Sequence, residues 1–523
     1  MDRCDDQYRA ARRDKMERLR AAGIDPYGQG FAPSHSVAAA RDLAPDMTEG
    51  DDQPRGERVA VAGRIGNLRK AGSKLRFATV FDRSRADLYL AQQGAGGEDL
   101  DGAEAKKARG IQLYLDRQVL GEDGFAVIAG LDLADWVGVE GPVGRTRTGE
   151  ISVFVERLVV LGKAQLPPPH QAGASRHELS PEIRQRQRYL DLMMSDQSLA
   201  RFVVRSRLVE ALRGFFTSRG YLEVETPMMH TVLGGASARP FVTHHNALDL
   251  DLYLRIAPEL HLKRLLVGGL ERVFEVNRNF RNEGIDLRHN PEFTMVEWYE
   301  AYADHHRMMD LTEELLRHLA DGVLGHRTLQ VGETRLDLDR PFARLGYHQA
   351  LRELAGIDHQ DRAAVAAAAT DHGLDPAAYA SHERLVEALW GEAVEPHLVQ
   401  PTFITDQPAW LSPLCRAHDD DPTRTMRFEL FVNRMELANA FTELNDPDQQ
   451  RARFAAQRDE AAAARDDEAG IADGRIDEDY CTALDHGLPC CGGEGLGIDR
   501  LVMLFTGTDS IRDVILFPTM RPT

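Results

Sequence analysis

The polar stretch Phe280–Phe293 (FRNEGIDLRHNPEF) constrains the fold more than any other part of this 523-residue chain. It lies between two apolar, β-rich runs, Arg272–Val276 before it and Thr294–Tyr299 after it. This pattern predicts two antiparallel strands joined by a long polar loop. Such a loop can place guanidinium groups against a phosphate and an aromatic face against a base. A solvated hairpin loop without a ligand is the alternative interpretation.

A second segment, Gly495–Leu501 (GLGIDRL), predicts a Gly-rich turn from a strand into a helix that ends on an arginine. Together the two stretches resemble motifs 2 and 3 of the class II aminoacyl-tRNA synthetases. The helix-and-strand pattern Arg201–Pro227 resembles motif 1, and the terminal segments Lys15–Tyr27 and Phe505–Pro522 resemble the lysyl-tRNA synthetase family. The resemblance implies an α+β fold, in which an N-terminal OB-fold β-barrel precedes a class II catalytic domain with an antiparallel sheet flanked by helices.

Composition favours an ordinary cytoplasmic protein. Hydrophobic and charged residues make up 43% and 28% of the chain, and no run of apolar residues suggests a signal peptide or a membrane span. The five cysteines show no C-x-x-C pair of the kind found in zinc sites. A net charge of −20 opposes indiscriminate binding of nucleic acid, although local basic patches such as 9–20 can still hold a specific tRNA.

Four parts are expected along the chain: an N-terminal basic helix and linker (1–55), an OB-fold anticodon-binding domain (56–165), a hinge (166–198) and the catalytic domain (199–523). Short β-rich runs with Gly turns indicate the barrel, and they lie at 59–65, 75–80, 112–115, 136–141 and 152–155. A generic β-barrel without a ligand is the alternative for this part. In the resemblance, motif 1 forms a homodimer interface.

The reaction that the resemblance implies is attack of a lysine carboxylate on the α-phosphate of ATP, followed by acyl transfer to the 3′ end of tRNA(Lys). Both attacking groups belong to substrates, so positioning and charge neutralisation can supply the catalysis. Arg281 is expected at the α-phosphate, Arg500 at the γ-phosphate and Phe293 on the adenine. The other ATP contacts are expected from Glu283, His289 and Asn290, and Glu429 and Glu436 are expected to hold Mg²⁺, which prefers hard oxygen ligands.

A lysine pocket needs carboxylates to stabilise a buried ammonium group. The resemblance places three carboxylates there, Glu259, Glu297 and Glu443, and a pocket lined in this way would repel aspartate. Further lysine contacts are expected from Gly235, Tyr299, Asn439 and Phe441. Glu259 has a simpler alternative, because it follows a proline at the start of a predicted helix and complements the helix dipole.

In the predicted barrel, Phe77 is the candidate for stacking on an anticodon base, with Arg64 nearby for phosphate or base edges. Phe77 could equally belong to the barrel core.

Three places depart from the family pattern. Residues 85–109 form extra sequence that we expect to be a surface loop. Arg434 stands where a glycine-containing turn is common, and it would be strained if the backbone there is left-handed. Cys490 and Cys491 replace Pro-Thr, and they are either reactive thiols activated by the nearby ATP-binding arginine or inert buried ones. A zinc site with His486 is a weaker possibility, since no fourth ligand has suitable spacing.

Two rival functions remain at this level: a non-catalytic tRNA-binding relative, and an enzyme that lysylates a protein. The retained arginines and glutamates argue against the first, and the N-terminal barrel argues against the second.

Overall fold

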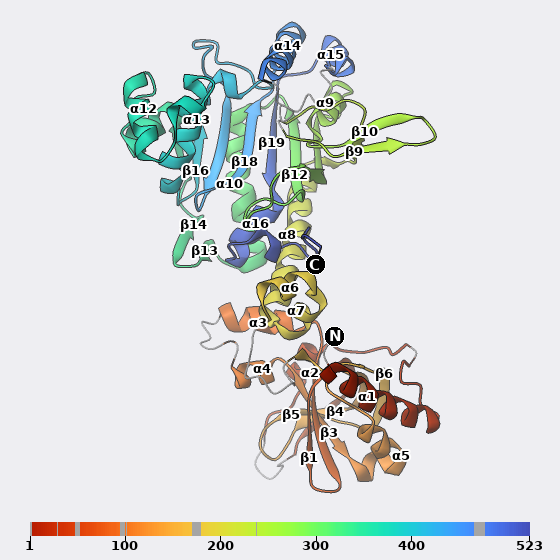
Figure 1. The fold of residues 1–523 in the computed structure, drawn as a ribbon. Coiled ribbons are helices and arrows are strands. Elements are labelled where there is room, and N and C mark those ends of the chain that lie inside the picture. The colour runs from red at the N-terminus through yellow and green to blue at the C-terminus, as the bar shows by residue number, and fades with distance from the viewer. Residues whose placement is uncertain are drawn as a thin grey trace. The chain divides into compact units, whose positions relative to one another are not determined.

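The computed structural model describes residues 3–28, 30–47, 53–94, 100, 102–169, 179–236, 238–464 and 476–522. The chain folds as two compact units, Met1–Val203 and Val204–Thr523 (Figure 1). The boundary falls inside the helix α8 (Asp196–Thr217). Within the described ranges, no helix combines the length and apolar character that crossing a membrane requires.

A closed β-sheet forms the centre of the first unit. Its strands are β1 (Arg55–Ala71), β2 (Leu75–Phe81), β3 (Ile111–Asp116), β4 (Trp136–Arg145), β5 (Ile151–Phe154) and β6 (Arg157–Gly162). They are ordered β1-β2-β3-β5-β4-β6, and an additional pairing of β1 with β4 closes the ring. Val59, Val61 and Ile65 alternate inward from β1 into a core of buried aliphatic side chains. The predicted OB-like barrel is therefore confirmed, with β6 as a strand that the sequence patterns did not identify.

Helices surround this barrel or follow it. They are α1 (Arg3–Ala21), α2 (Val37–Asp42), α3 (Arg85–Gly94), α4 (Ala103–Ala108), α5 (Arg117–Ala129), α6 (Pro181–Arg186) and α7 (Arg188–Met194). The basic helix at the N-terminus was predicted, whereas α5 was not. The predicted hinge carries α6, α7 and the first three residues of α8, and its residues 170–178 lie outside the described ranges.

The extra sequence 85–109 is not a plain surface loop, because α3 and α4 lie within it. The side chain of Arg109 is fully buried, and its Nε donates to Asp196 at 2.7 Å. Arg85 pairs with the same carboxylate at 3.2 Å, and Tyr89 is buried beside it in a small apolar cluster. A buried arginine needs such a partner. Residues 95–99 and 101 are outside the described ranges.

The second unit is built on a large mixed sheet, ordered β15-β16-β17-β18-β19-β12-β11-β7. The bounds are β7 (Leu222–Glu223), β11 (Arg272–Phe280), β12 (Glu292–Ala301), β15 (Ala343–Gly346), β16 (Thr402–Thr405), β17 (Arg427–Val432), β18 (Met435–Thr442) and β19 (Cys491–Gly497). The sheet is antiparallel at its centre, as predicted, but the edge pairs β15–β16 and β11–β7 are parallel. The predicted strand 221–227 is reduced to the two residues of β7.

Helices and smaller sheets flank this core (Figure 1). The helices are α9 (Glu259–Val267), α10 (His305–Leu319), α11 (Tyr347–Ala355), α12 (Arg362–Asp371), α13 (His382–Ala393), α14 (Pro447–Ala464), α15 (Glu478–Asp485) and α16 (Ile498–Thr506), with a π-helical turn at Ala320–Leu324 and 3₁₀ turns at Pro376–Ala378, Glu395–His397, Ala409–Leu411 and Ile511–Asp513. The remaining strands are β8 (Met229–His230), β9 (Val242–His245), β10 (Leu250–Leu254), β13 (Thr328–Val331) and β14 (Thr334–Asp337). The class of fold predicted from the sequence, α+β with a barrel before a helix-flanked sheet, is confirmed.

Candidate active site

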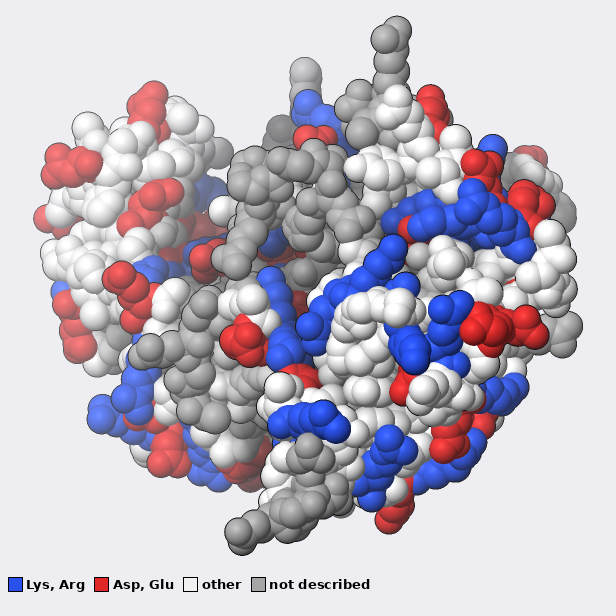
Figure 2. Space-filling model, turned by 90° about the horizontal axis from the view of Figure 1, so that it is seen from below, with Lys and Arg blue, Asp and Glu red and all other residues white. Residues whose placement is uncertain are grey.

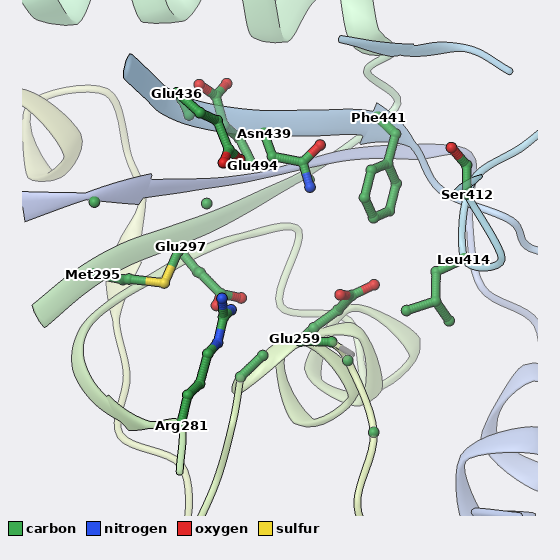
Figure 3. Close-up of a pocket in the computed structure, with 18 of the residues that line it drawn as sticks. Glu259, Arg281, Met295, Glu297, Ser412, Leu414, Glu436, Asn439, Phe441 and Glu494 are labelled. Carbon is green, nitrogen blue, oxygen red and sulfur yellow. The ribbon is translucent and has the colours of Figure 1, made fainter. Parts of the chain in front are cut away.

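A cavity of about 560 Å³ in the second unit gathers most of the residues predicted for the catalytic domain. The predicted residues that line it are Gly235, Glu259, Arg281, Glu283, His289, Asn290, Phe293, Glu297, Tyr299, Glu436, Asn439, Phe441 and Arg500. Figure 3 shows Arg281, Glu297 and Glu259 facing Glu436, Asn439 and Phe441 across this space. Glu429 and Glu443 are not among the lining residues.

The hairpin of β11 and β12 positions the first cationic group. The two strands pair from Arg272 opposite Glu300 to Phe280 opposite Glu292, so Arg281 begins the connecting loop, as predicted. The Arg281 guanidinium lies over the Phe293 ring at 5.1 Å, and its buried Nε has no hydrogen-bond partner among the described residues. A buried, unpaired guanidinium N–H suits an anionic ligand. An aromatic ring beside it suits a nucleotide base.

Arg500 contributes a second cation from α16, which follows the end of β19 at the same edge of the sheet as the start of β12. One guanidinium nitrogen donates to the carbonyl of Glu436 at 2.6 Å, and the other lies 3.1 Å from Nε2 of His289. Because arginine can only donate, His289 must accept at Nε2 and carry its proton on Nδ1. That Nδ1 lies 2.8 Å from a carboxylate oxygen of Asp286, which sequence reasoning did not single out.

The buried carboxylate of Asp499 fixes the start of α16. It accepts from Arg205 of α8 at 2.6 Å and from the backbone N–H of Thr294 in β12 at 2.7 Å. The residue next to Arg500 thus ties α16 to β12 and to α8. Arg500 is therefore held at the cavity by the two elements that carry the other predicted motifs.

Acidic residues gather at the other end of the cavity. Glu259 stands in the first turn of α9, and Glu297 and Tyr299 project from β12. Burial, together with Glu259 and Glu275, raises the pKa of Glu297 to about 8. The Tyr299 hydroxyl donates to Glu297 at 3.3 Å. A cation that binds beside such a carboxyl group stabilises its ionised form.

Gly235 brings the backbone close to this acidic end. Its φ is +87°, a conformation that favours glycine, and an added Cβ would lie 3.1 Å from Cβ of Glu259. A ligand at the acidic end of the cavity could therefore approach the backbone of Gly235 closely.

Glu443 departs from its expected place in the cavity wall. It is 1% exposed and pairs with the ammonium group of Lys263, which also lies 2.6 Å from Glu259. Although burial alone would lower the pKa of Lys263, the two carboxylates raise it well above its usual value, so this ammonium stays charged. Lys263 follows Glu259 by one helical turn, a spacing that signals an ion pair, but nothing local signals its contact with Glu443.

The two predicted magnesium ligands lie on neighbouring strands, Glu429 in β17 and Glu436 in β18. Burial raises the pKa of Glu429 to about 7, and the negative charge of Glu436 contributes to that shift, as expected for two nearby carboxylates. Glu429 also accepts from Arg427 at 2.6 Å. A divalent cation between two such carboxylates would relieve their repulsion, and Mg²⁺ prefers hard oxygen ligands of this kind. In the part of the chain that the structure describes, no group of three or more His, Cys, Asp or Glu side chains is arranged to hold a metal ion by itself.

For Cys491, the structure favours the inert, buried thiol over the reactive one. Burial and the charge of Glu443 raise the pKa of its thiol well above the usual value, which disfavours the thiolate. Cys491 begins β19 and Arg500 follows the end of this strand, so the two are separated by about 20 Å of extended chain. Cys490 is exposed, and its Sγ lies 3.7 Å from the carbonyl of Ala303. Arg500, which was expected to activate these thiols, is therefore not beside Cys491.

In the first unit, a row of aromatic rings crosses the barrel strands. Phe77 of β2 lies opposite Tyr114 of β3, which lies opposite Phe154 of β5, with centroid distances of 5.5 and 4.9 Å. Arg69 and Arg55 cap the two ends, each with its guanidinium 4.4 Å from the ring centroid. Alternating cations and aromatic faces are the usual means of binding single-stranded RNA.

Arg64 does not belong to this row, contrary to the prediction that it lies near Phe77. It pairs in register with Phe81, about 13 Å further along β2, and its guanidinium lies over Trp136 at 4.7 Å. Figure 2 shows bands of Lys and Arg side chains on the face of the molecule seen there, with acidic side chains between them. Local basic surface therefore exists despite the net charge of −20.

The fold and this cavity are those of a class II tRNA synthetase. The family model "tRNA synthetases class II (D, K and N)" matches residues 180–521, which include the whole cavity.

Among curated proteins, the lysine–tRNA ligase of Moorella thermoacetica is 46% identical over 517 residues, covering 98% of this chain and 97% of the relative. The lysine–tRNA ligases of Carboxydothermus hydrogenoformans and Bacillus subtilis are each 44% identical, covering 98% of this chain and 97% and 96% of those relatives. The chain belongs to the lysine–tRNA ligase family of class II synthetases.

Proposed function

We propose that this protein activates L-lysine with ATP to lysyl-adenylate and transfers the lysyl group to the 3′ end of tRNA(Lys). The observation that carries the proposal is that one cavity holds two arginines, Arg281 and Arg500, together with a buried acidic group that includes Glu259 and Glu297. The arginines match a polyphosphate, and the glutamates match an amine. The family membership supports the same reaction.

Within this proposal, each residue takes the role that the family resemblance implies, and its place in the cavity lining supports that role. Arg281 binds the α-phosphate and Arg500 the γ-phosphate, while Phe293 stacks on the adenine and Glu283, His289 and Asn290 complete the nucleotide contacts. Gly235, Glu259, Glu297, Tyr299, Asn439 and Phe441 bind lysine. Glu443 lies behind the cavity wall and acts on the site through its ion pair with Lys263. The lysine carboxylate and then the tRNA hydroxyl are the nucleophiles, so these residues orient groups and neutralise charge.

Mg²⁺ belongs to the proposal as a cofactor held by Glu429 and Glu436. When bound, the ion neutralises phosphate oxygens next to the arginines. The adjacency of the two carboxylates on β17 and β18 supports this assignment.

The barrel is proposed to recognise the anticodon of tRNA(Lys) through Phe77 and its aromatic neighbours. Arg64 contributes from a separate patch, where its guanidinium lies over Trp136. A homodimer through α8 and β7, the motif 1 segment, and a cytoplasmic location complete the proposal. Sedimentation of the purified protein tests the dimer, because a monomer at micromolar concentration contradicts it.

ATP–pyrophosphate exchange measured with each of the twenty amino acids tests the activation step. We expect lysine to support exchange far above aspartate and asparagine. Charging of tRNA(Lys) transcript tests the transfer step and separates this function from the protein-lysylating and non-catalytic alternatives. Exchange that is strongest with aspartate, or no lysine-dependent exchange, contradicts the proposal.

A further inference from the structure

Arg427, at the start of β17, makes an unusual set of contacts for a residue that the sequence analysis did not identify. Its Nε donates to the side-chain oxygen of Asn439 at 2.9 Å, and one terminal nitrogen donates to Glu429 at 2.6 Å. The other terminal nitrogen donates to the carbonyl of Leu411 and to the hydroxyl of Ser412, both at 2.9 Å. Arg427 thus touches two candidate site residues and one wall of the cavity.

These contacts decide how the amide of Asn439 is oriented. Because Arg427 donates and cannot accept, the atom of Asn439 that faces it must be the oxygen. The amide nitrogen then points toward the side of the cavity where Arg281 and Glu259 lie (Figure 3). The hydrogen bonds among the described residues leave this nitrogen unused, so two N–H donors face the cavity.

The two N–H donors of Asn439 favour a ligand group that accepts hydrogen bonds. Of the polar groups of lysine, both ammonium groups are donors and only the carboxylate accepts. The carboxylate therefore belongs at Asn439, and the ammonium groups belong toward Glu259 and Glu297. In this orientation the carboxylate faces the cavity side that holds Arg281, where the proposed function places the α-phosphate.

We propose that Arg427 is a positioning residue for the activation step: it fixes the amide of Asn439 so that its N–H groups hold the carboxylate of the bound lysine. The inference rests on the proposed function and deepens it. Arg427 itself touches no substrate in this account, since its side chain is occupied by Asn439, Glu429 and the segment at Leu411 and Ser412.

The test compares Arg427→Met, Asn439→Ala and the double variant in lysine-dependent ATP–pyrophosphate exchange. Loss of a hydrogen bond to a charged group predicts that each single variant raises the KM for lysine by about 10- to 100-fold. If Arg427 acts through Asn439, the double variant is no worse than the more affected single variant. Arg427→Lys keeps the positive charge but not the fork of donors, and it should give a smaller loss.

A second readout uses cadaverine, which is lysine without its carboxylate, as a competitor of lysine. Its inhibition constant should stay within about threefold of the wild-type value in Asn439→Ala and Arg427→Met, because the missing contact is to the carboxylate. Asn439→Ala also leaves the pair of Arg427 with Glu429 in place, so its KM for ATP should change by less than about threefold.

Arg453→Met is the matched control. Arg453 holds the same wall segment through the carbonyls of Ser412 and Cys415, and none of its hydrogen bonds to the described residues reaches Asn439. The inference is overturned if Arg453→Met raises the KM for lysine as much as Arg427→Met does. It is equally overturned if the effects of Arg427→Met and Asn439→Ala multiply, or if cadaverine weakens in parallel with lysine. Should Arg427→Met fail to fold, Arg427→Lys and Asn439→Ala decide the question. Failure of the proposed function would instead appear as a lack of lysine-dependent exchange in the unmodified protein.

Discussion

Asn433 and Arg434 form a two-residue turn between β17 and β18, and both have left-handed backbones with φ of 53° and 61°. Such turns favour Asn-Gly, because a side chain at the second position is strained. The sequence predicts strain at Arg434 if its backbone is left-handed, and the structure shows that conformation. A hydrogen bond partly offsets this strain, since the Nε of Arg434 donates to the carbonyl of Pro396 at 3.0 Å.

Arg434→Gly and Arg434→Ala separate these two effects. Both lose the contact with Pro396, but only glycine relieves the backbone. We expect the glycine variant to be more stable than the alanine variant by about 1 kcal/mol. Thermal unfolding of the two variants measures the difference, and equal midpoints would show that the turn is unstrained.

Glu494 is a buried acid outside the proposed chemistry. Its two oxygens lie 2.6 and 2.7 Å from the hydroxyl of Thr312, which also lies 2.8 Å from the carbonyl of Met308. A single hydroxyl proton cannot serve all three acceptors. A protonated Glu494 that donates to Thr312, which in turn donates to Met308, satisfies the geometry. Burial raises the pKa of Glu494 well above its usual value, in agreement with a neutral carboxyl.

Glu494 therefore makes stability depend on pH. Its pKa is higher in the folded than in the unfolded state, so its contribution is fully present below the unfolded value of about 4.3 and declines as pH rises toward the folded value. Relative to Glu494→Gln, which has a similar shape and does not titrate, the wild type should lose up to about 1.4 kcal/mol per pH unit over this window. Unfolding midpoints at pH 5 and pH 8 test this, and a gap that does not widen with pH means that Glu494 is not held neutral.

At the scale of elements, β19 allows close packing around the cavity because its cavity face is nearly free of side chains. A Cβ on Gly493 would clash with the side chains of Glu443 and Tyr299, both in the buried acidic layer. A Cβ on Gly497 would meet only the Arg500 side chain, at 3.7 Å. The glycines of β19 thus leave room for the polar side chains of its neighbouring strands, β12 and β18.

Gly493→Ala and Gly497→Ala form a pair that tests this role. Overpacking costs about 1–3 kcal/mol, and at Gly493 it displaces Tyr299 and Glu443. We expect Gly493→Ala to lower lysine-dependent exchange by at least about tenfold and Gly497→Ala to change it by less than about threefold. If Gly493→Ala keeps wild-type exchange and thermal stability, Glu443 and Tyr299 are not packed as tightly against Gly493 as described.

Local sequence patterns predicted the elements that depend on nearest neighbours. The alternation in Arg272–Val276 and Thr294–Tyr299 predicted β11 and β12, and the turn signals between the barrel runs predicted most of its strands. The helices of the 85–109 segment were missed because their anchor, Arg109 on Asp196, joins residues far apart in the chain. The same reason explains why Lys263 on Glu443 and Arg427 on Asn439 were not foreseen. The resemblance predicted many of the residues that line the cavity, but not that Glu429 and Glu443 lie outside its lining, and side-chain partners across strands need the fold.

At the scale of the whole molecule, the two units should carry separable functions. Loss of a stacking aromatic costs about 1–3 kcal/mol per base. Phe77→Ala or Tyr114→Ala should therefore lower charging of tRNA(Lys) by about 10- to 100-fold, with ATP–pyrophosphate exchange unchanged. The cavity proposed to bind lysine and ATP lies in the other unit.

Trp136→Ala is the comparison for this prediction. Trp136 is half-exposed beneath Arg64 on a different part of the same barrel. If Trp136→Ala impairs charging while Phe77→Ala does not, the Arg64 patch recognises the tRNA and the aromatic row is barrel core.

The pair of Lys263 with Glu443 has a consequence for the order of assembly. The two residues come from α9 and from the end of β18, which are distant in sequence, and both side chains are sealed from water. Burying either charge without the other costs about 3–5 kcal/mol. Because Lys263 also has Glu259 as a partner within α9, the cost falls on Glu443, and a partly folded chain that buried Glu443 before α9 had docked is disfavoured. The acidic end of the cavity should consequently form in a single late step, when α9, β18 and β19 come together.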